Sequence, residues 1–126
     1  MYLGVDSVYA ITLDRNKLRK KHINSLSKDL DLNINIIQGI DNKDVIPLTN
    51  KFIENNIGDW FFDPAGWYSV GILCCALSHR KAWKAFLDSG DEVGLFLEDD
   101  AMPTWHIHSY DFNAVRNELD TLDWGV

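Results

Sequence analysis

Cysteine is scarce in this chain of 126 residues, and its two cysteines, Cys74 and Cys75, are neighbours. Adjacent cysteines rarely bridge each other, so a disulfide framework is excluded as the basis of the fold. No second cysteine pair or histidine pair accompanies them, which argues against a metal role. We interpret both as small buried residues of a reducing compartment, and the expected location is the cytoplasm.

Long apolar runs and an excess of positive charge are also missing. No apolar run approaches the roughly 18–20 residues of a membrane span, and residues 1–15 lack the basic start and compact apolar segment of a secretory signal. Lysine and arginine number 12 against 19 aspartates and glutamates, and the net charge of −7 argues against nucleic acid or an anionic membrane as a partner. A glycine-rich phosphate loop of the dinucleotide-binding or P-loop type is absent as well.

The chain does contain an alternation of strand-like and helix-like segments. Strands are predicted over 8–13, 33–37 and 93–97, and helices over 17–30, 71–89 and 113–122. This order is typical of an α/β fold with a mainly parallel sheet and helices on both faces, and one domain is expected over 1–126. Residues 41–68 are less regular, with a short helix predicted over 50–56 and an aromatic cluster at 60–68. Residues 123–126 look like the start of another strand.

Three consecutive carboxylates, Glu98, Asp99 and Asp100, follow the apolar run at 93–97. Because that run does not alternate, it predicts a buried parallel strand rather than an edge strand. Strand alternation places Glu98 and Asp100 on one side, where they are able to share a divalent cation, with Asp99 on the other. The alternative is that the acids are solvated residues at a strand end.

The predicted first helix begins with five basic residues within seven: Arg15, Lys17, Arg19, Lys20 and Lys21. Arg15 and Arg19 are four residues apart and share a helical face near the helix start. A helix N-terminus with guanidinium groups suits a phosphate or diphosphate, while the alternative is a solvated basic face. Right-handed crossovers would bring this helix start and the carboxylate triplet to one crevice.

Both longer helices have a predicted core face. For the helix over 17–30 it consists of Leu18, His22, Leu26 and Leu30, and for the helix over 71–89 of Ile72, Cys75, Ala76, His79, Trp83 and Phe86. A histidine in such a position is more often a hydrogen-bonded core residue than a catalytic one. Ser78 beside it either bonds back to a backbone carbonyl or points into the crevice.

Three motifs occur in order along the chain: ITLDR at 11–15 with Arg19 behind it, GILCCALSH at 71–79 followed by Trp83, and LFLEDD at 95–100. Together they resemble glycosyltransferase family 25, which includes the lipooligosaccharide glycosyltransferases and the procollagen galactosyltransferases. The resemblance covers most of the chain.

The chain departs from the family pattern at three positions. Thr12 replaces an asparagine, Cys74 replaces a second glycine, and Ile72 replaces a common glutamate. Family catalytic domains continue well beyond the acidic motif. The chain is therefore expected to be the N-terminal, donor-binding portion of a catalytic domain, without the general base of the reaction. The alternatives are a short relative that binds the donor without turnover and a site that a partner chain completes.

The resemblance implies a GT-A type, Rossmann-like domain that uses a divalent metal, usually manganese. By position, Glu98 and Asp100 would hold the metal in a DxD-like arrangement. The implied donor-binding residues are Thr12, Asp14, Arg15, Arg19, Ser78, His79 and Asp99.

The function implied by the resemblance is inverting transfer of galactose or glucose from a UDP-sugar to a glycan acceptor such as lipooligosaccharide. The alternative is a non-catalytic nucleotide-sugar-binding or assembly module derived from such an enzyme. The expected partners are the UDP-sugar and the acceptor. A homo-oligomer is a further option, because an exposed final strand edge would favour self-association.

Overall fold

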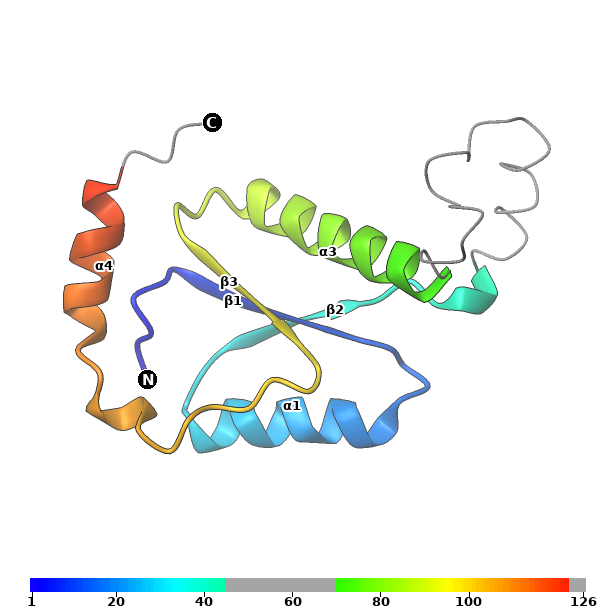
Figure 1. Cartoon of the computed structure of the whole chain (residues 1–126), viewed down its shortest axis with the longest axis horizontal. Helices are drawn as coiled ribbons and strands as arrows, with labels where there is room; N and C mark the ends of the chain where they lie inside the picture. The colour runs from blue at the N-terminus through cyan, green and yellow to red at the C-terminus, as the bar shows by residue number, and fades with distance from the viewer. Residues whose placement is uncertain (45–69, 123–126) are drawn as a thin grey trace, which may run out of the picture.

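The computed structural model describes residues 1–44 and 70–122, and it confirms the predicted alternation of strands and helices (Figure 1). The elements are β1 (Ser7–Thr12), α1 (Lys17–Asp29), β2 (Ile34–Gln38), α3 (Val70–Ser89), β3 (Gly94–Glu98), the short 3₁₀ helix η1 (Ile107–Ser109) and α4 (Phe112–Thr121). The predicted helix over 50–56, the aromatic cluster at 60–68 and the strand start at 123–126 lie outside the described residues.

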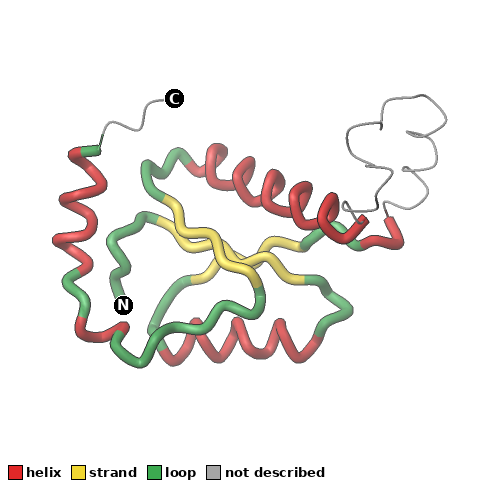
Figure 2. Tube along the Cα trace, viewed as in Figure 1, coloured by secondary structure: helices red, strands yellow, loops and turns green. Residues whose placement is uncertain are grey.

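All three strands are parallel and follow the order β2-β1-β3 (Figure 2). Val8 of β1 pairs with Ile34 of β2, and Tyr9 pairs with Phe96 of β3. The helices α1 and α3 lie on opposite sides of this sheet, as in a small Rossmann-like unit (Figure 1). The α/β fold class predicted from the sequence is therefore confirmed.

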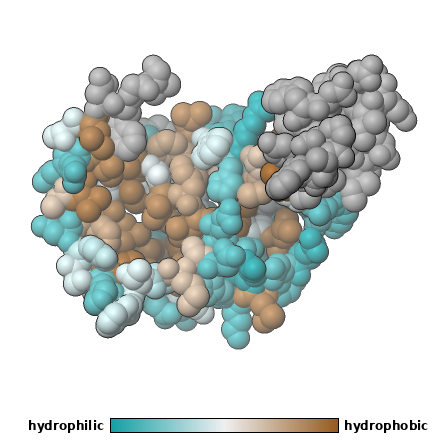
Figure 3. All heavy atoms as spheres, viewed as in Figure 1, coloured by the Kyte–Doolittle hydropathy of each residue, from teal (hydrophilic) through white to brown (hydrophobic). Residues whose placement is uncertain are grey.

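The prediction of a buried, non-edge strand over 93–97 is wrong for the described part of the chain. β3 has β1 as its neighbour on one side, and its residues from Gly94 to Leu97 are half-buried. Figure 3 shows apolar side chains gathered on the surface between α3 and α4, where β3 lies toward the viewer. An apolar run thus indicated the parallel strand correctly but could not distinguish full from partial burial.

One face of the sheet packs against α1. Ala10 of β1 forms a buried cluster with Ile23 and Leu26 of α1 and with Leu30 and Leu32, which follow the helix in the chain. The predicted α1 stripe is partly wrong, because Leu18 is 81% exposed and Ile23 takes a core position instead. Four-residue spacing drifts around a helix of 3.6 residues per turn, so its first member turns away from the sheet.

The other face packs against α3 through aromatic rings. Tyr9 stacks on Phe96 at 5.4 Å between ring centroids, and Phe86 of α3 meets both rings edge-on. A Cβ at Gly94 would lie 2.8 Å from the Phe86 ring, so this close approach requires glycine. The predicted end of the helix at residue 89 is confirmed, and Gly90 directly after it has a φ of 78°, which glycine adopts readily.

The predicted core face of α3 is largely wrong. Among residues 71–89 of α3 the buried side chains are Cys74, Ser78 and Ala82, whereas Ile72 and Trp83 are each 51% exposed. Hydrophobicity alone misplaced the face because a serine and small residues pack closest to the strands. Close helix–sheet contact favours small side chains over the large apolar ones that the pattern singled out.

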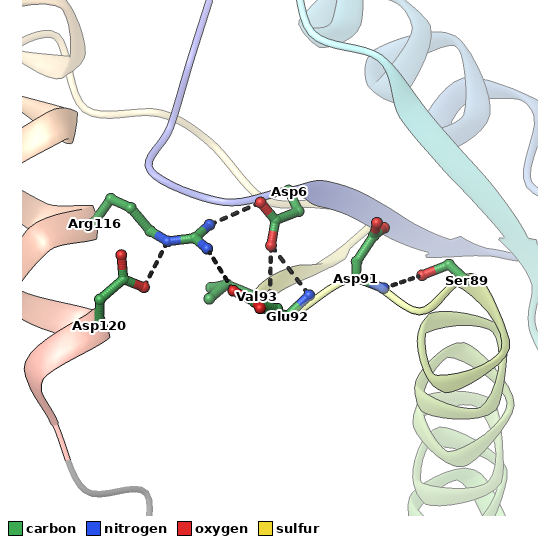
Figure 4. Close-up of polar contacts among 7 residues, drawn as sticks. All are labelled: Asp6, Ser89, Asp91, Glu92, Val93, Arg116 and Asp120. Carbon is green, nitrogen blue, oxygen red and sulfur yellow. Dashed lines mark hydrogen bonds and ion pairs between the residues drawn. The ribbon is translucent and has the colours of Figure 1, made fainter.

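At the amino end of the sheet, Arg116 attaches α4 to the strands (Figure 4). Its guanidinium bonds Asp6 before β1 at 2.8 Å, Glu92 before β3 at 3.2 Å and Asp120 on α4 at 2.8 Å. Asp6 also accepts hydrogen bonds from the backbone N–H groups of Glu92 and Val93.

Within the described residues, no helix is both long and apolar enough to cross a membrane.

Candidate functional site

A cavity of about 230 Å³ lies at the carboxyl edge of the sheet, between the strand ends and the first half of α3. Its lining includes Thr12 of β1, Gly39 after β2, Ser78 and His79 of α3, and Glu98 and Asp99 at the end of β3. Open α/β sheets bind their ligands at this edge. The structure therefore brings predicted site residues from β1, α3 and the end of β3 to one place.

Ser78 holds the wall of this cavity together. Its hydroxyl donates a hydrogen bond of 2.6 Å to the Cys74 carbonyl and accepts one of 2.8 Å from the Ile40 backbone N–H. The predicted bond back to a helix carbonyl is thus confirmed, and the second bond joins α3 to the loop after β2. Both bonds are to backbone groups of the chain itself. Ser78 therefore lines the cavity, but its hydroxyl stabilises the cavity wall.

Glu98 faces α3 across the cavity. Its Oε1 lies 3.3 Å from His79 Nε2 and 3.7 Å from Cys75 Sγ. The His79 side chain is 24% exposed and that of Glu98 is 59% exposed, so the group borders solvent. His79 is therefore at the edge of the cavity with a carboxylate partner, and it does not lie within the apolar core face that the sequence predicted.

The interpretation of both cysteines as buried residues is wrong for one of them. Cys74 is buried, but Cys75 is exposed and lies in a group with His79 and Glu98 whose ligand atoms are all within 4.8 Å of one another. Partial loss of hydration, followed by the negative charge of Glu98, raises the pKa of the Cys75 thiol. The sequence interpretation overlooked that Cys75 and His79, four residues apart on one helix, are spaced so that their side chains lie close together.

Arg19 connects α1 to the end of the acidic triplet. Its Nη1 lies 2.9 Å from Asp99 Oδ1 and 2.8 Å from Asp100 Oδ2. Hydrogen bonds to Asp100 and Asp99 raise the pKa of the guanidinium, which therefore stays charged. His22 of α1 supports the same junction through a 2.8 Å contact between its Nε2 and the Ala101 carbonyl oxygen. The predicted meeting of the basic helix start with the acids is confirmed for Arg19.

The acids do not follow the predicted alternation. β3 ends at Glu98, and a hydrogen bond from the Ala101 N–H to the Glu98 carbonyl closes a turn there. Glu98 consequently faces α3, while Asp99 and Asp100 both face Arg19 of α1. Strand geometry applies only as far as the strand continues, so it could not place the two residues after it.

The other predicted donor residues lie around the start of α1. Asp14 pairs with Lys20 at 3.1 Å, and Arg15 pairs with Asp41 at 2.6 Å. Thr12 is buried, and its hydroxyl has no hydrogen-bond partner within residues 1–44 and 70–122. The sequence interpretation overlooked Asp41, whose side chain is only 10% exposed and holds Arg15 beside the end of β2.

Such a crevice, on a Rossmann-like unit with acids and arginines at the carboxyl edge of its strands, is typical of proteins that bind phosphorylated ligands. Residues 5–118 match glycosyltransferase family 25 (LPS biosynthesis protein). The chain belongs to this family, and the resemblance noted in the sequence is confirmed.

A curated relative supports the same assignment. The chain is 26% identical to human procollagen galactosyltransferase 2 over 100 residues, which make up 78% of this chain and 16% of that protein. The chain thus corresponds to a small fraction of the relative's length. No solved structure matches it.

Proposed function

We propose that this chain binds the donor in a hexosyltransferase that moves galactose or glucose from a UDP-sugar to a glycan acceptor such as lipooligosaccharide, with inversion. Family membership supports glycosyl transfer, and the curated relative is named as a galactosyltransferase. The observation that carries the proposal is the meeting of Arg19 with Asp99 and Asp100 beside the cavity at the carboxyl edge of the sheet.

In this proposal the start of α1 binds the donor diphosphate. The Arg19 side chain is 43% exposed, and it would exchange a carboxylate for a phosphate oxygen without leaving its place. Arg15 is more exposed, at 64%, and its position before the helix adds charge near the free N–H groups of the first turn. Asp41 holds Arg15 from the β2 side, which limits the orientations that Arg15 adopts.

Members of this family generally use a divalent metal. Glu98 and Asp100 would hold it here, because both carboxylates are 59% exposed and oxygen ligands suit Mn²⁺. When bound, such an ion neutralises the charge that develops on the departing diphosphate. Glu98 now contacts His79 and Asp100 contacts Arg19, so sharing one ion requires the two carboxylates to turn toward each other.

Calorimetry with UDP, UDP-galactose, UDP-glucose and UDP-N-acetylhexosamines, each with and without Mn²⁺, tests donor binding. Thermal unfolding provides a second readout, because a ligand that binds the folded state stabilises it. We expect UDP to bind and stabilise the chain in the presence of Mn²⁺. An absence of both heat and stabilisation would refute donor binding by this chain.

Asp100→Asn tests the metal assignment against a matched control, Asp88→Asn. Asp88 pairs with Lys84 on α3, and its side chain is 65% exposed, close to the 59% of Asp100. Asp100→Asn should weaken Mn²⁺-dependent UDP binding about tenfold or more, whereas Asp88→Asn should leave it unchanged. Equal affinities for both variants would remove Asp100 from the metal site.

Hydrolysis of the bound donor separates the two functions that the sequence left open. Release of free hexose from the preferred UDP-sugar in the presence of Mn²⁺ would support a catalytic role. Tight binding without any turnover would favour the nucleotide-sugar-binding module instead.

A further inference from the structure

Cys75 and His79 lie one turn apart on α3, which spans Val70–Ser89. Residues four apart on a helix project from the same face, with their Cβ atoms about 5–6 Å apart. This spacing lets two side chains of one helix reach the same ion without any change in the backbone. Both residues border the cavity at the carboxyl edge of the sheet.

A third group reaches the same point from a different element. The Oε1 atom of Glu98, the last residue of β3, lies 3.3 Å from His79 Nε2 and 3.7 Å from Cys75 Sγ. Ligands around a tetrahedral ion at zinc bond lengths are separated by about 3.3–3.8 Å. Two of the three separations already match this geometry, and the ligand atoms of all three residues lie within 4.8 Å of one another.

We propose that Cys75, His79 and Glu98 form a binding site for zinc or another borderline divalent cation. A thiolate, an imidazole and a carboxylate are all zinc ligands, and the thiolate disfavours hard ions such as Mg²⁺ and Mn²⁺. Binding breaks the S–H bond of Cys75, releases its proton to solvent and forms the metal–sulfur bond. In the present arrangement the Cys75 thiol donates a hydrogen bond to Glu98, and bonds from both side chains to the ion would replace it.

Three protein ligands leave a position of a tetrahedral ion free for water or another ligand. Since all three residues line the cavity, that position would face the same space as the proposed donor site. The inference does not depend on the proposed function, because it needs neither UDP nor transfer activity. The two proposals share Glu98, so zinc bound here would compete with manganese for that carboxylate.

Metal titration of the full chain, followed by calorimetry and by competition with a chromogenic zinc indicator, tests the site. We expect Zn²⁺ to bind at least about a hundredfold more tightly than Mn²⁺, with release of a proton. Co²⁺ in the same site should give the near-ultraviolet charge-transfer band of a thiolate ligand. Zinc affinity no greater than manganese affinity, or cobalt binding without this band, would overturn the proposal.

Cys75→Ser and His79→Gln should each weaken zinc binding by about a hundredfold or more, since loss of outer-shell partners alone costs about 10–100-fold. Cys75 is exposed, so the serine variant should fold normally, and its far-ultraviolet circular dichroism verifies this. Cys74→Ala keeps the Cys75 thiol and His108→Gln changes an exposed histidine of η1, so both controls should bind zinc normally. Unchanged zinc affinity in Cys75→Ser and His79→Gln would assign the metal to other residues.

Discussion

The two ends of the parallel sheet each place an arginine among carboxylates, and the two arginines differ in how fully they are bonded. At the amino end, Arg116 uses Nε, Nη1 and Nη2 for three carboxylates, and its side chain is 16% exposed (Figure 4). At the carboxyl end, both ion pairs of Arg19 use Nη1, and its side chain is 43% exposed.

This difference indicates different tasks. Arg116 joins α4 to the segments before β1 and β3, and its bonds to Asp6 and Asp120 raise the pKa of the guanidinium well above its ordinary range. Its donors are directed to partners inside the chain, which suits a structural connection. Arg19 remains partly exposed beside a cavity, which suits the proposed exchange of a carboxylate partner for an incoming anion.

Replacement of Arg116 should have the largest effect on stability. Arg116→Gln leaves Asp6, Glu92 and Asp120 without their shared cation, so we expect the melting temperature to fall by roughly 4–8 °C. Differential scanning calorimetry of this variant beside Arg19→Gln measures the contrast. A larger loss for Arg19→Gln would reverse the assignment of the structural role.

Replacement of Arg19 should act on binding instead. Arg19→Gln removes the donor that is proposed to hold the diphosphate, so UDP affinity with Mn²⁺ should fall roughly tenfold, while the melting temperature changes by less than about 2 °C. Calorimetry measures the affinity, and Lys84→Gln on α3 serves as a control for the lost charge. Equal affinity for Arg19→Gln and Lys84→Gln would separate Arg19 from the donor site.

At the carboxyl end, the negative charge of Glu98 should also affect the reactivity of the Cys75 thiol. Partial loss of hydration raises the pKa of Cys75 and Glu98 raises it further, so Glu98→Gln should lower this pKa and increase thiolate at pH 8. In a Cys74→Ala background, we expect iodoacetamide to alkylate Cys75 roughly two to three times faster. Mass spectrometry follows the reaction, and an unchanged rate would mean that Glu98 does not control the thiol.

The smallest effect should be the acid dependence of the amino end. Hydrogen bonds from Arg116 and from the Val93 backbone lower the pKa of Asp6, so the unfolded chain takes up a proton at a higher pH than the folded chain does. The stabilisation is present above about pH 4 and is lost as the pH falls through the lowered value. It should amount to at most about 1 kcal/mol, because the pair is partly solvated.

Chemical denaturation between pH 2.5 and 6 measures this contribution in the unaltered chain and in Asp6→Asn. The two stability curves should converge as the pH falls, since protonated Asp6 resembles asparagine in charge. Parallel curves over this range would show that Asp6 does not contribute to the acid dependence.

Local patterns predicted the elements well and their faces less well. Alternating and apolar runs located the strands, and α3 ends directly before Gly90, as the sequence predicted. The core faces were less predictable, as Leu18 and Trp83 show. Which side of a helix is buried depends on the shape of the surface that it meets, and hydrophobicity along one segment does not describe that surface.

In the candidate site, too, some contacts were predictable from the sequence and others were not. The meeting of Arg19 with the acids was predictable, because parallel strands present their carboxyl ends at one edge. The contact of Glu98 with Cys75 and His79 was not, since it depends on a turn that begins at Glu98 and on the rotation of α3. Arg116 and Asp6 were also overlooked, because they are 110 residues apart and neither belongs to a recognisable motif.

The sequence by itself determined the α/β class, the parallel sheet and the family, because these follow from periodicity and from motifs that are local in the chain. Only the tertiary structure decided which charged side chains are fully bonded within the chain and which remain exposed to solvent. An ion pair depends on distances of a few ångströms between distant segments, and such distances arise only when helices and strands have packed.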